Sequence, residues 1–417
     1  MGQGRSAQAG PDHLHGSRQT PGGDGRRRVP VPRRHLLRVT DPATGAREPL
    51  AGCEAPVRRA GALVARFEDG GLVLENYLTG RQAVVHHQLI PALAALTDPV
   101  PAHEAVALLG GPPAEPLLDE LVRQDLLLRC GTPEEQRDAS VEESWVWGPE
   151  AQWFHYRTRR TAFTYDLDAE RDNLLAHAAT TPPPPPFTDL GPPHLPLPAP
   201  LELTAELGAT LRRRRTERRF SGQPLSLDLL ATILHTTWGV TQRREDPGVG
   251  PVIFKTSPSG GARHPVEVYL VALNIDGLKP GAYHYCSGRH TLTPTGEAGS
   301  RDSLISRVLD AVTQQPWAAQ AAAVFVMTGV TTRSAWKYQQ SHAYRVLLLD
   351  AGHLAQTFHL ACTALDLAPW TTAALDEDAA EQLLGITDPS ELVLYAAACG
   401  HHAANSTTQG PFQSRQG

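Results

Sequence analysis

A short glycine- and serine-rich loop contains the residue types best suited to hold a ligand. The stretch Thr256–Tyr269 reads TSPSGGARHPVEVY, with Pro258 and the glycine pair Gly260 and Gly261. Glycine lacks the Cβ atom that would keep a ligand off the backbone, and proline fixes φ. Such a loop can present several N–H groups and hydroxyls to a flat or anionic group. The alternative is that the stretch is only a tight turn before a strand at Val266–Leu273, which would have the same composition.

A run of arginines earlier in the chain is a second candidate. The segment Arg212–Phe220 reads RRRRTERRF and has a hydroxyl at Thr216. Paired guanidiniums suit bidentate phosphate binding, so the run and the glycine loop together predict a phosphorylated cofactor. The alternative is that the arginines form a solvent-exposed helix end, which would have the same sequence pattern. The sequence has no GxGxxG after a first strand and no GxxxxGK[ST], so neither a dinucleotide-binding fold nor a P-loop is indicated.

Composition and charge limit the classes of protein that fit. The chain has 417 residues, 41% of them hydrophobic and 20% charged, which is typical of a globular protein of two or three domains. The net charge of −6 argues against a general nucleic-acid binder. Five cysteines without a CxxC motif predict neither a metal site nor a disulfide framework. Because no apolar run reaches transmembrane length and no signal peptide is recognisable, we expect a soluble, cytoplasmic protein without membrane contact.

Composition shifts along the chain predict two folded domains joined by a linker. Residues 1–30 have almost nothing apolar, which predicts a disordered tail. The remaining boundaries place an N-terminal domain at 31–130, an aromatic segment and proline-rich linker at 131–200, a second domain at 201–402 and a tail at 403–417.

The N-terminal domain is expected to contain a β-hairpin and three helices. Residues 69–71, DGG, lie between two apolar stretches, which is a hairpin signal. Helices are predicted over Val85–Leu96, Pro101–Leu109 and Pro113–Leu128. This winged-helix-like order resembles the peptide-recognition elements of ribosomal-peptide maturation enzymes, which bind a leader peptide at the hairpin edge. A packing or dimerisation domain would have the same elements.

The second domain mixes helices and strands without a regular βαβ repeat, so the predicted fold class is α+β. Ser226 is the expected N-cap of a helix over Leu227–Trp238. The long apolar helix His342–Leu367 is expected to be buried on all sides. Strands are predicted over Val266–Leu273, Ala321–Met327 and Leu392–Ala398.

Four motifs of this domain together resemble the FMN-dependent nitroreductase superfamily. They are RRTERRF at 214–220, SPSGGARHPVEVY at 257–269, WKYQQSHAYRVLLLDAGHLAQ at 336–356 and a helix that ends in LDLAPWTTA. Within the superfamily, the sequence is similar to SagB-type dehydrogenases, which make azoles in ribosomal peptides. The pair Lys337 and Tyr338 and the segment GAYHY are features of that subfamily. The resemblance covers roughly residues 205–400, and the combination of motifs is specific although each alone is weak.

The resemblance implies a homodimer of α+β subunits with one FMN at each of two intersubunit sites. The residues matching the phosphate and ribityl ligands are Arg214, Arg215, Thr216 and Arg218, with Arg415 as a C-terminal phosphate ligand. The residues matching the loop that contacts the isoalloxazine, often from the other subunit, are Pro258, Ser259, Gly260, Gly261, Ala262 and Arg263. The residues matching the segment that faces flavin N5 are Pro369, Trp370 and Thr371. Four arginines with Glu217 among them depart from the pattern and leave open which guanidiniums face the phosphate.

The chemistry implied for Lys337 and Tyr338 is proton abstraction. Oxidising an azoline to an azole removes a proton α to a carbonyl and imine, and a hydride that FMN accepts. The protein must supply the base, and an ammonium beside a tyrosine is expected to lower the tyrosine pKa. Adjacent residues on a helix point about 100° apart, so we expect the pair at a helix start or in a loop, unless only one of the two faces the flavin. A surface lysine next to a core tyrosine is the alternative.

We therefore predict an FMN-dependent dehydrogenase that oxidises thiazoline or oxazoline rings in a heterocyclised precursor peptide, with a cyclodehydratase as partner. One alternative is a small-molecule NAD(P)H flavin reductase or nitroreductase, which leaves the first 200 residues unexplained. Another is a non-catalytic subunit that binds leader peptide. The sequence identifies neither the precursor peptide nor the preferred ring nor the final electron acceptor.

Overall fold

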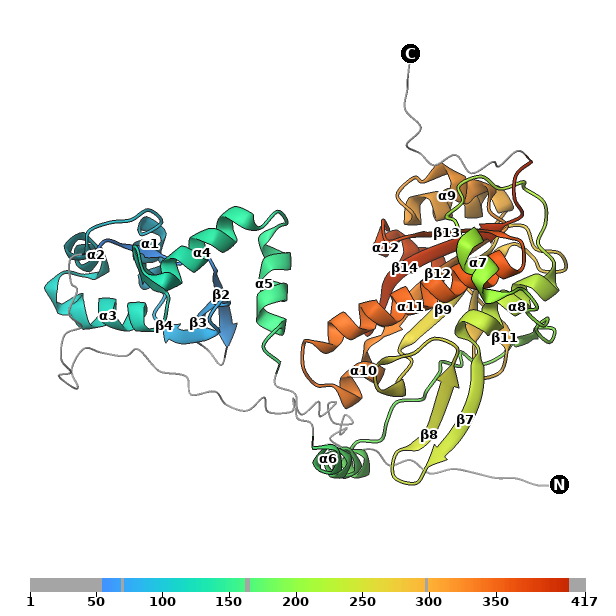
Figure 1. The fold of residues 1–417 in the computed structure, drawn as a ribbon, viewed down its shortest axis with the longest axis horizontal. Coiled ribbons are helices and arrows are strands. Elements are labelled where there is room, and N and C mark those ends of the chain that lie inside the picture. The colour runs from blue at the N-terminus through green and yellow to red at the C-terminus, as the bar shows by residue number, and fades with distance from the viewer. Residues whose placement is uncertain (1–54, 69–70, 162–165, 297–298, 405–417) are drawn as a thin grey trace, which may run out of the picture. The chain divides into compact units, whose positions relative to one another are not determined.

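The computed structural model describes residues 55–68, 71–161, 166–296 and 299–404 (Figure 1). The chain divides into two compact units, Met1–Arg157 and Thr158–Gly417. The tail expected at 1–30 lies outside the described residues, as do most of the C-terminal tail and Arg415. No helix within the described residues is long and apolar enough to cross a membrane.

The N-terminal unit packs short helices around two small antiparallel sheets. One sheet has the order β2-β3-β4, and the other pairs β1 with β5. The strands are β1 (Val57–Arg59), β2 (Leu63–Glu68), β3 (Gly71–Asn76), β4 (Arg81–Val85) and β5 (Leu127–Arg129). The helices are α1 (Leu89–Ala95), α2 (Ala102–Leu109), η1 (Pro112–Ala114), α3 (Glu115–Arg123), α4 (Pro133–Ser144) and α5 (Pro149–Thr158). The strands expected on both sides of the hairpin turn are β2 and β3, which pair with each other. Residues 69–70 of the turn lie outside the described residues.

Two helix predictions in this unit are wrong at their ends. The helix expected from Val85 begins at Leu89, because residues 81–85 form the edge strand β4. The helix expected to reach Leu128 ends at Arg123, because Asp125 has a positive φ of 53° and the chain then enters β5. Both errors occur at short apolar stretches that form strands. Such stretches fit the 3.6-residue period of a helix as well as the two-residue period of a strand.

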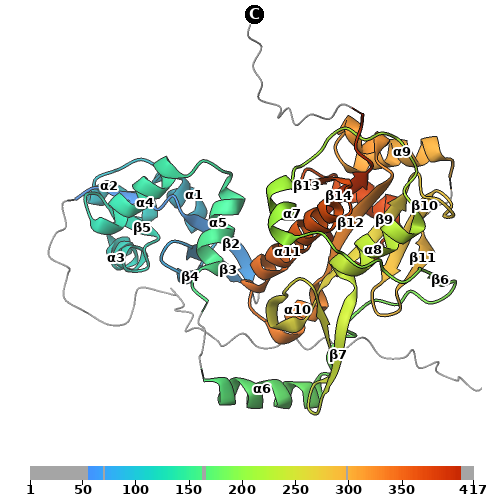
Figure 2. The same ribbon diagram turned by 45° about the vertical axis from the view of Figure 1, so that its right-hand side comes forward.

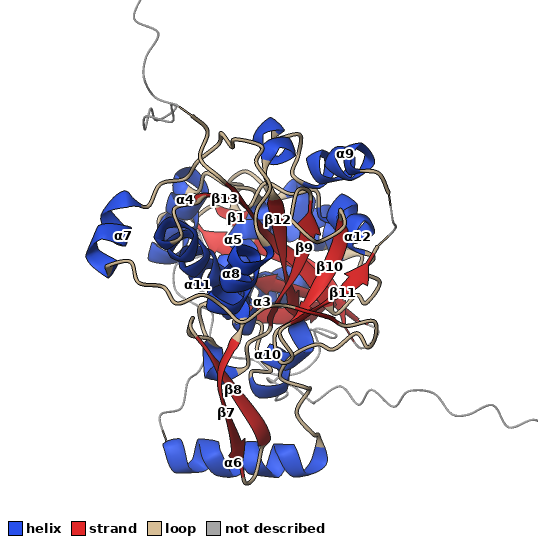
Figure 3. Ribbon diagram, turned by 90° about the vertical axis from the view of Figure 1, so that its right-hand side faces the viewer, coloured by secondary structure: helices blue, strands red, loops and turns tan. Residues whose placement is uncertain are grey.

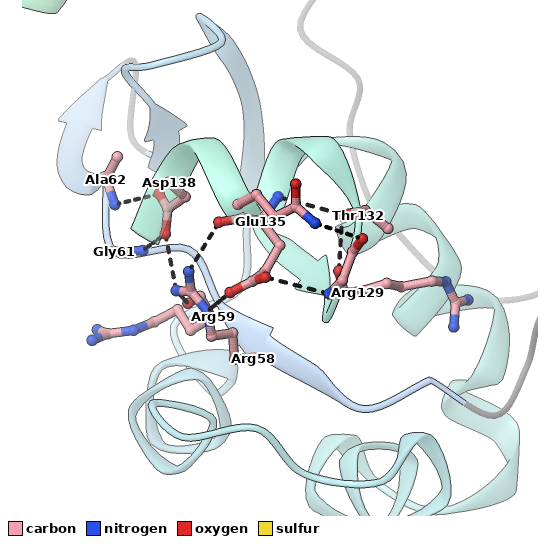
Figure 4. Close-up of polar contacts among 10 residues, drawn as sticks. Arg58, Arg59, Gly61, Ala62, Arg129, Thr132, Glu135 and Asp138 are labelled. Carbon is pink, nitrogen blue, oxygen red and sulfur yellow. Dashed lines mark hydrogen bonds and ion pairs between the residues drawn. The ribbon is translucent and has the colours of Figure 1, made fainter. Parts of the chain in front are cut away.

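A buried polar cluster fixes α4 to the first strand (Figure 4). Arg58 Nε donates to Glu135 Oε1 at 3.0 Å, and its Nη1 donates to Asp138 Oδ2 at 2.9 Å. Asp138 also accepts from the backbone N–H groups of Gly61 at 2.9 Å and Ala62 at 3.3 Å. The start of the predicted linker is therefore an ordered part of the N-terminal unit.

The second unit is built around a seven-stranded antiparallel sheet with the order β13-β14-β12-β9-β10-β11-β6. Its strands are β6 (Leu195–Pro196), β9 (Val266–Ala272), β10 (Gly281–Cys286), β11 (Thr291–Thr295), β12 (Ala323–Val330), β13 (Ala368–Thr372) and β14 (Glu391–Gly400). Helices cover both faces, with α8 (Leu227–Trp238) and α11 (Ala343–Ala364) on one side and α9 (Arg301–Ala311) and α12 (Glu377–Leu384) on the other (Figure 3). The fold class is α+β, as predicted.

The central strand β9 shows why the sheet is buried on both faces. Val268 and Leu270 pack into the core under α8 and α11, whereas Tyr269 and Val271 pack into the core under α9 and α12. Side chains alternate between the two faces of a strand, so a continuous apolar run fills both cores at once.

The sequence LDLAPWTTA is not the end of a helix. The helix α11 ends at Ala364, and Asp366 adopts a positive φ of 56°. Residues Ala368–Thr372 then form β13, which pairs with β14. The predicted flavin-facing residues at 369–371 therefore lie on an edge strand of the main sheet.

The expectation that the long helix is buried on all sides is also wrong for a single chain. Leu347 and Phe358 of α11 are buried against the sheet, but Leu348 is 44% exposed and Leu349 61% exposed. The neighbouring helix α7 (Leu207–Arg213) likewise exposes Leu211. The sheet covers only one side of α11, so within one chain the outer leucines remain open to solvent.

A two-stranded hairpin projects from the body of this unit, and α6 (Leu167–Thr180) lies across it (Figure 2). The hairpin consists of β7 (Val240–Asp246) and β8 (Gly250–Lys255). Arg171 of α6 makes two hydrogen bonds to the carboxylate of Asp246, at 2.8 and 3.2 Å. The remaining short helices are η2 (Gly260–Ala262), η3 (Pro316–Gln320) and α10 (Thr331–Lys337).

Candidate functional site

The glycine loop lies between β8 and β9 and is held to α11 by one carboxylate. Ser259 Oγ donates to Asp350 Oδ2 at 2.6 Å, and the N–H of Gly260 donates to Asp350 Oδ1 at 3.2 Å. Ser259 Oγ also accepts from the N–H of His264 at 2.9 Å. Burial raises the pKa of Asp350, while the two donors oppose that shift. Sequence reasoning missed this residue, although an acidic side chain in an otherwise apolar helix was a usable signal.

The loop directly contacts the Lys337-Tyr338 pair. A Cβ atom on Gly261 would lie 2.5 Å from Tyr338 Oη and 2.8 Å from Lys337 Nζ. Lys337 is the last residue of α10, and Tyr338 follows it in an extended conformation with φ −120° and ψ 91°. The pair was expected at a helix start or in a loop, and it lies at a helix end. The break in the helix lets both side chains reach the same glycine.

The electrostatic surroundings shift the pKa values of the pair in opposite directions. Burial lowers the pKa of Lys337, and the nearby charge of Arg263 lowers it further. Burial raises the pKa of Tyr338, and Glu170 and Asp350 add to that rise. The expectation that the tyrosine pKa is lowered is therefore wrong for this arrangement. Lys337 is the member of the pair whose titration moves towards neutral pH.

Arg263 is a buried cation beside this pair. Its side chain is only 6% exposed, and its guanidinium lies 4.8 Å from the centre of the Trp336 ring. Nη2 donates to the carbonyl oxygen of Pro184 at 3.4 Å. Burial lowers the pKa of Arg263, and Arg333 lowers it as well. Arg263 therefore contributes positive charge next to Lys337, and no carboxylate of the described residues is among the groups that shift its pKa.

The arginine run lies along the edge strand β13. The N–H of Glu217 donates to the carbonyl oxygen of Pro369 at 2.8 Å. Arg214, directly after α7, lies close enough to His359 to help lower its pKa to about 4, a shift for which burial is the larger cause. His359 Nε2 is 3.2 Å from Thr371 Oγ1. Arg214 and Thr371, predicted to bind one cofactor, are thus brought to the same end of α11.

The other members of the run point elsewhere. The guanidinium of Arg218 stacks over Trp317 at 5.2 Å, and Trp317 packs against Trp370. Arg215 Nη1 donates to the carbonyl oxygen of Arg214 at 2.7 Å. Thr216 is exposed. Arg214 is therefore the arginine of the predicted set best placed to receive a phosphate.

The arginine run and the glycine loop both pack along α11. The loop packs on Val346 and Asp350 near the start of α11, whereas Arg213 donates to the carbonyl oxygen of Thr363 near its end. Ser257, directly before the loop, contacts Thr357 at 2.6 Å, only two residues from His359, which Arg214 approaches. The two segments therefore lie along the same helix and come closest near residues 357–359.

Beneath the loop lies a buried charge network that sequence reasoning missed. Arg333 forms an ion pair with Glu267 and donates to the carbonyl oxygens of Pro185 at 2.8 Å and His264 at 3.2 Å. Burial lowers the pKa of the neighbouring Lys255 to about 8. Arg333 thus ties the proline segment to the sheet and supports the loop from below.

Comparison with known proteins gives a family match for this unit. Residues 211–401 match the nitroreductase family. The candidate nitroreductase MJ1384 of Methanocaldococcus jannaschii is 29% identical over 44% of this chain and 86% of its own length. The trifolitoxin-processing protein TfxB of Rhizobium leguminosarum bv. trifolii is 30% identical over 43% of this chain. The match covers only 48% of TfxB.

The solved structures that match this chain include the Escherichia coli microcin synthetase McbBCD complex with truncated pro-MccB17 bound, through one of its chains. It is 19% identical, covers 64% of this chain and 92% of that one, and has a TM-score of 0.38. A nitroreductase-family structure from Desulfovibrio desulfuricans, in complex with FMN, is 16% identical, covers 50% of this chain and 93% of that one, and has a TM-score of 0.33.

Proposed function

Because residues 211–401 form a nitroreductase-family domain, we propose that this protein is an FMN-dependent dehydrogenase that oxidises azoline rings in a ribosomally made peptide. The observation that carries the proposal is the contact of Gly261 with Lys337 and Tyr338, which puts a titratable pair against the loop expected to face the flavin. The relationship to a trifolitoxin-processing protein supports a peptide as the substrate.

The residues present fit a flavin in two respects. The absent side chain at Gly261 makes room for Tyr338 and Lys337 to lie directly against the loop. Among the described residues, Arg214 has no carboxylate partner and the buried Nδ1 of His359 has no hydrogen-bond partner. We assign Arg214 to the phosphate, residues 369–371 to the ring edge and residues 258–263 to the ring face. Bound FMN would supply the hydride acceptor.

In this proposal Lys337 removes the α-proton of the azoline. Its lowered pKa increases the fraction of neutral amine available near neutral pH, which is what a general base requires. Tyr338 remains a neutral phenol because its pKa is raised, so it can donate a hydrogen bond to the substrate. Arg263 and Trp336 keep the lysine in a partly desolvated position beside the loop.

We propose a homodimer in which each flavin takes the arginine half-site of one copy and the glycine loop of the other. Within one chain the loop contacts Asp350 of α11, and Arg213 contacts Thr363 near the end of the same helix. The exposed Leu348 and Leu349 of α11, with Leu207 and Leu211 of α7, offer an apolar surface for such a contact.

For the N-terminal unit we propose a winged-helix-like module that binds leader peptide. The strand β2 is at one edge of its sheet, and Phe67 on that strand is 87% exposed. An extended peptide can add to such an edge through backbone hydrogen bonds. A cyclodehydratase that delivers the heterocyclised peptide is the proposed partner.

Absorbance spectroscopy of the purified protein tests the proposal. We expect flavin bands that bleach without oxygen when an azoline peptide is added and remain when NAD(P)H alone is added. A protein without flavin would instead be a peptide-binding scaffold subunit. Rapid bleaching by NAD(P)H without peptide would identify a small-molecule reductase.

A further inference from the structure

An open pocket of about 170 Å³ lies between α6, the β7–β8 hairpin and the end of α10. It adjoins the glycine loop, and Lys337 is part of its wall. None of the roles proposed above uses the residues that α6 and the hairpin contribute to it. Its position beside the proposed base makes it the natural place for the part of a substrate next to the reacting ring.

The charges around this pocket are unbalanced. Four cations line it, namely Arg171, Arg244, Arg263 and Lys337. The acidic groups are Asp246 in the wall and Glu170, which lies near Lys337. Asp246 already accepts two hydrogen bonds from Arg171 and two from the backbone N–H groups of Gly248 and Val249, each at 3.1 Å. The Asp246 carboxylate therefore does not neutralise the other three cations.

Arg263 is the buried member of this set and lacks full pairing. It is 94% buried, given its 6% exposure, and its Nε has no hydrogen-bond partner in the described part of the chain. Its nearest charged neighbours include Arg333 and Lys337, both positive. A buried cation among like charges is stabilised strongly by an incoming anion, because little water screens the interaction.

The rest of the wall is apolar, which favours anions that carry an apolar group. Leu174, Val249, Val252 and Trp336 line the pocket alongside the cations. Such walls suit an organic group with a carboxylate better than free phosphate, which would bring no apolar surface to bury.

We propose that this pocket binds a carboxylate of the peptide substrate through Arg244 and Arg263, next to the ring that is oxidised. The inference rests on the proposed function and names a feature of its substrate. The carboxylate comes from an acidic side chain near the ring or from the peptide C-terminus.

Four fluorescently labelled model peptides test the proposal. Each contains one ring, flanked by Glu or Gln, and ends in a free or an amidated carboxyl group. The peptides are used in the oxidised thiazole form, so that binding measured by anisotropy does not depend on turnover. We expect the wild-type holoenzyme to bind at least one carboxylate-bearing peptide about 10-fold or more tightly than the peptide lacking both carboxylates. Comparison of the four peptides then identifies the source of the carboxylate.

A matched pair of variants localises the effect. Arg244→Glu should abolish the preference for the carboxylate, whereas Arg243→Glu should retain it. Arg243 is adjacent on β7 but points to the opposite face, where it contacts Phe187 and the carbonyl of Gly288. Melting temperature and flavin content check that both variants fold, and Arg244→Gln replaces Arg244→Glu if the latter does not fold.

Equal affinity of the wild-type protein for all four peptides overturns the inference, as does an equal effect of both variants. If azoline peptides are oxidised but show no carboxylate preference, the inference fails while the proposed function stands. If carboxylate binding is seen without any oxidation, the proposed function fails while the pocket assignment stands.

Discussion

A Cβ atom on Gly261 would lie 2.5 Å from the hydroxyl oxygen of Tyr338. At that distance a side chain at position 261 could be accommodated only if Tyr338 moved. The loop and the titratable pair are therefore one structural unit, although 76 residues separate Gly261 from Lys337 in the sequence. This contact connects the segment predicted to face the flavin with the residues predicted to handle the proton.

Replacing Gly261 with alanine should displace Lys337 and Tyr338 and lower azoline turnover by about 10-fold or more. The new methyl group would also be strained, because Gly261 has φ of 60°. Gly277→Ala is the matched control, since Gly277 has φ of 76° and nothing within 4 Å of its Cβ position. We expect both variants to lose about 1 kcal/mol of stability, and only Gly261→Ala to lose activity. Wild-type turnover of Gly261→Ala would contradict the assignment.

The pH dependence of turnover should follow the charges around Lys337. If the neutral amine is the base, the rate rises with pH through the lysine pKa and then levels off. Arg263 lowers that pKa and Glu170 raises it. Arg263→Gln should therefore move the rising limb to higher pH, and Glu170→Gln should move it to lower pH. Rate profiles of both variants that coincide with the wild-type profile would exclude Lys337 as the titrating group.

Ser259→Ala should weaken flavin binding by loosening the glycine loop. The hydroxyl donates to the Asp350 carboxylate, and a hydrogen bond to a charged group contributes about 1.5–3 kcal/mol. Ser257→Ala is the control, because Ser257 contacts Thr357 and the carbonyl of His353 on the same helix but no carboxylate. FMN titration of the two apoproteins measures the difference. Equal FMN affinities would show that the Asp350 contact does not shape the cofactor site.

Leu349→Glu should break the proposed dimer and release the flavin with it, because a charge on the exposed face of α11 cannot be buried without a partner. Leu190→Glu is the control, since Leu190 is also exposed, at 47%, and its neighbours Asp189 and Gly191 bond to Arg289 and Thr293 rather than to α11 or α7. Light scattering coupled to absorbance reports mass and flavin together. A wild-type monomer that retains active FMN would rule out the two-copy site.

Local signals made part of this fold predictable. Ser226 caps α8 through the N–H of Leu229, and the helix has the predicted bounds Leu227–Trp238. The apolar run at β9 also forms a strand within one residue of its predicted end. The superfamily resemblance could be predicted because its motifs are local in sequence. The family match over residues 211–401 confirms it.

The errors concern features that depend on distant residues. β13 was placed at the end of a helix because its pairing with β14 is invisible in the segment itself. The pKa of Tyr338 was predicted to fall because Lys337 is adjacent in sequence, whereas burial, Glu170 and Asp350 raise it. Asp350 was overlooked because its role depends on Ser259, which only the tertiary fold brings near. The assignment of Arg415 lies outside the described residues.

Mass spectrometry of a heterocyclised peptide incubated with the enzyme tests the central claim most directly. We expect the wild-type holoenzyme to remove two hydrogen atoms per ring. We expect Lys337→Ala to do so about 10²–10⁴-fold more slowly, the usual contribution of a positioned base, while retaining FMN. Tyr338→Phe should be slowed less than Lys337→Ala, because the phenol stays protonated. An unchanged peptide mass after incubation with flavin-loaded wild-type protein would contradict azoline oxidation. Full activity of Lys337→Ala would contradict its role as the base.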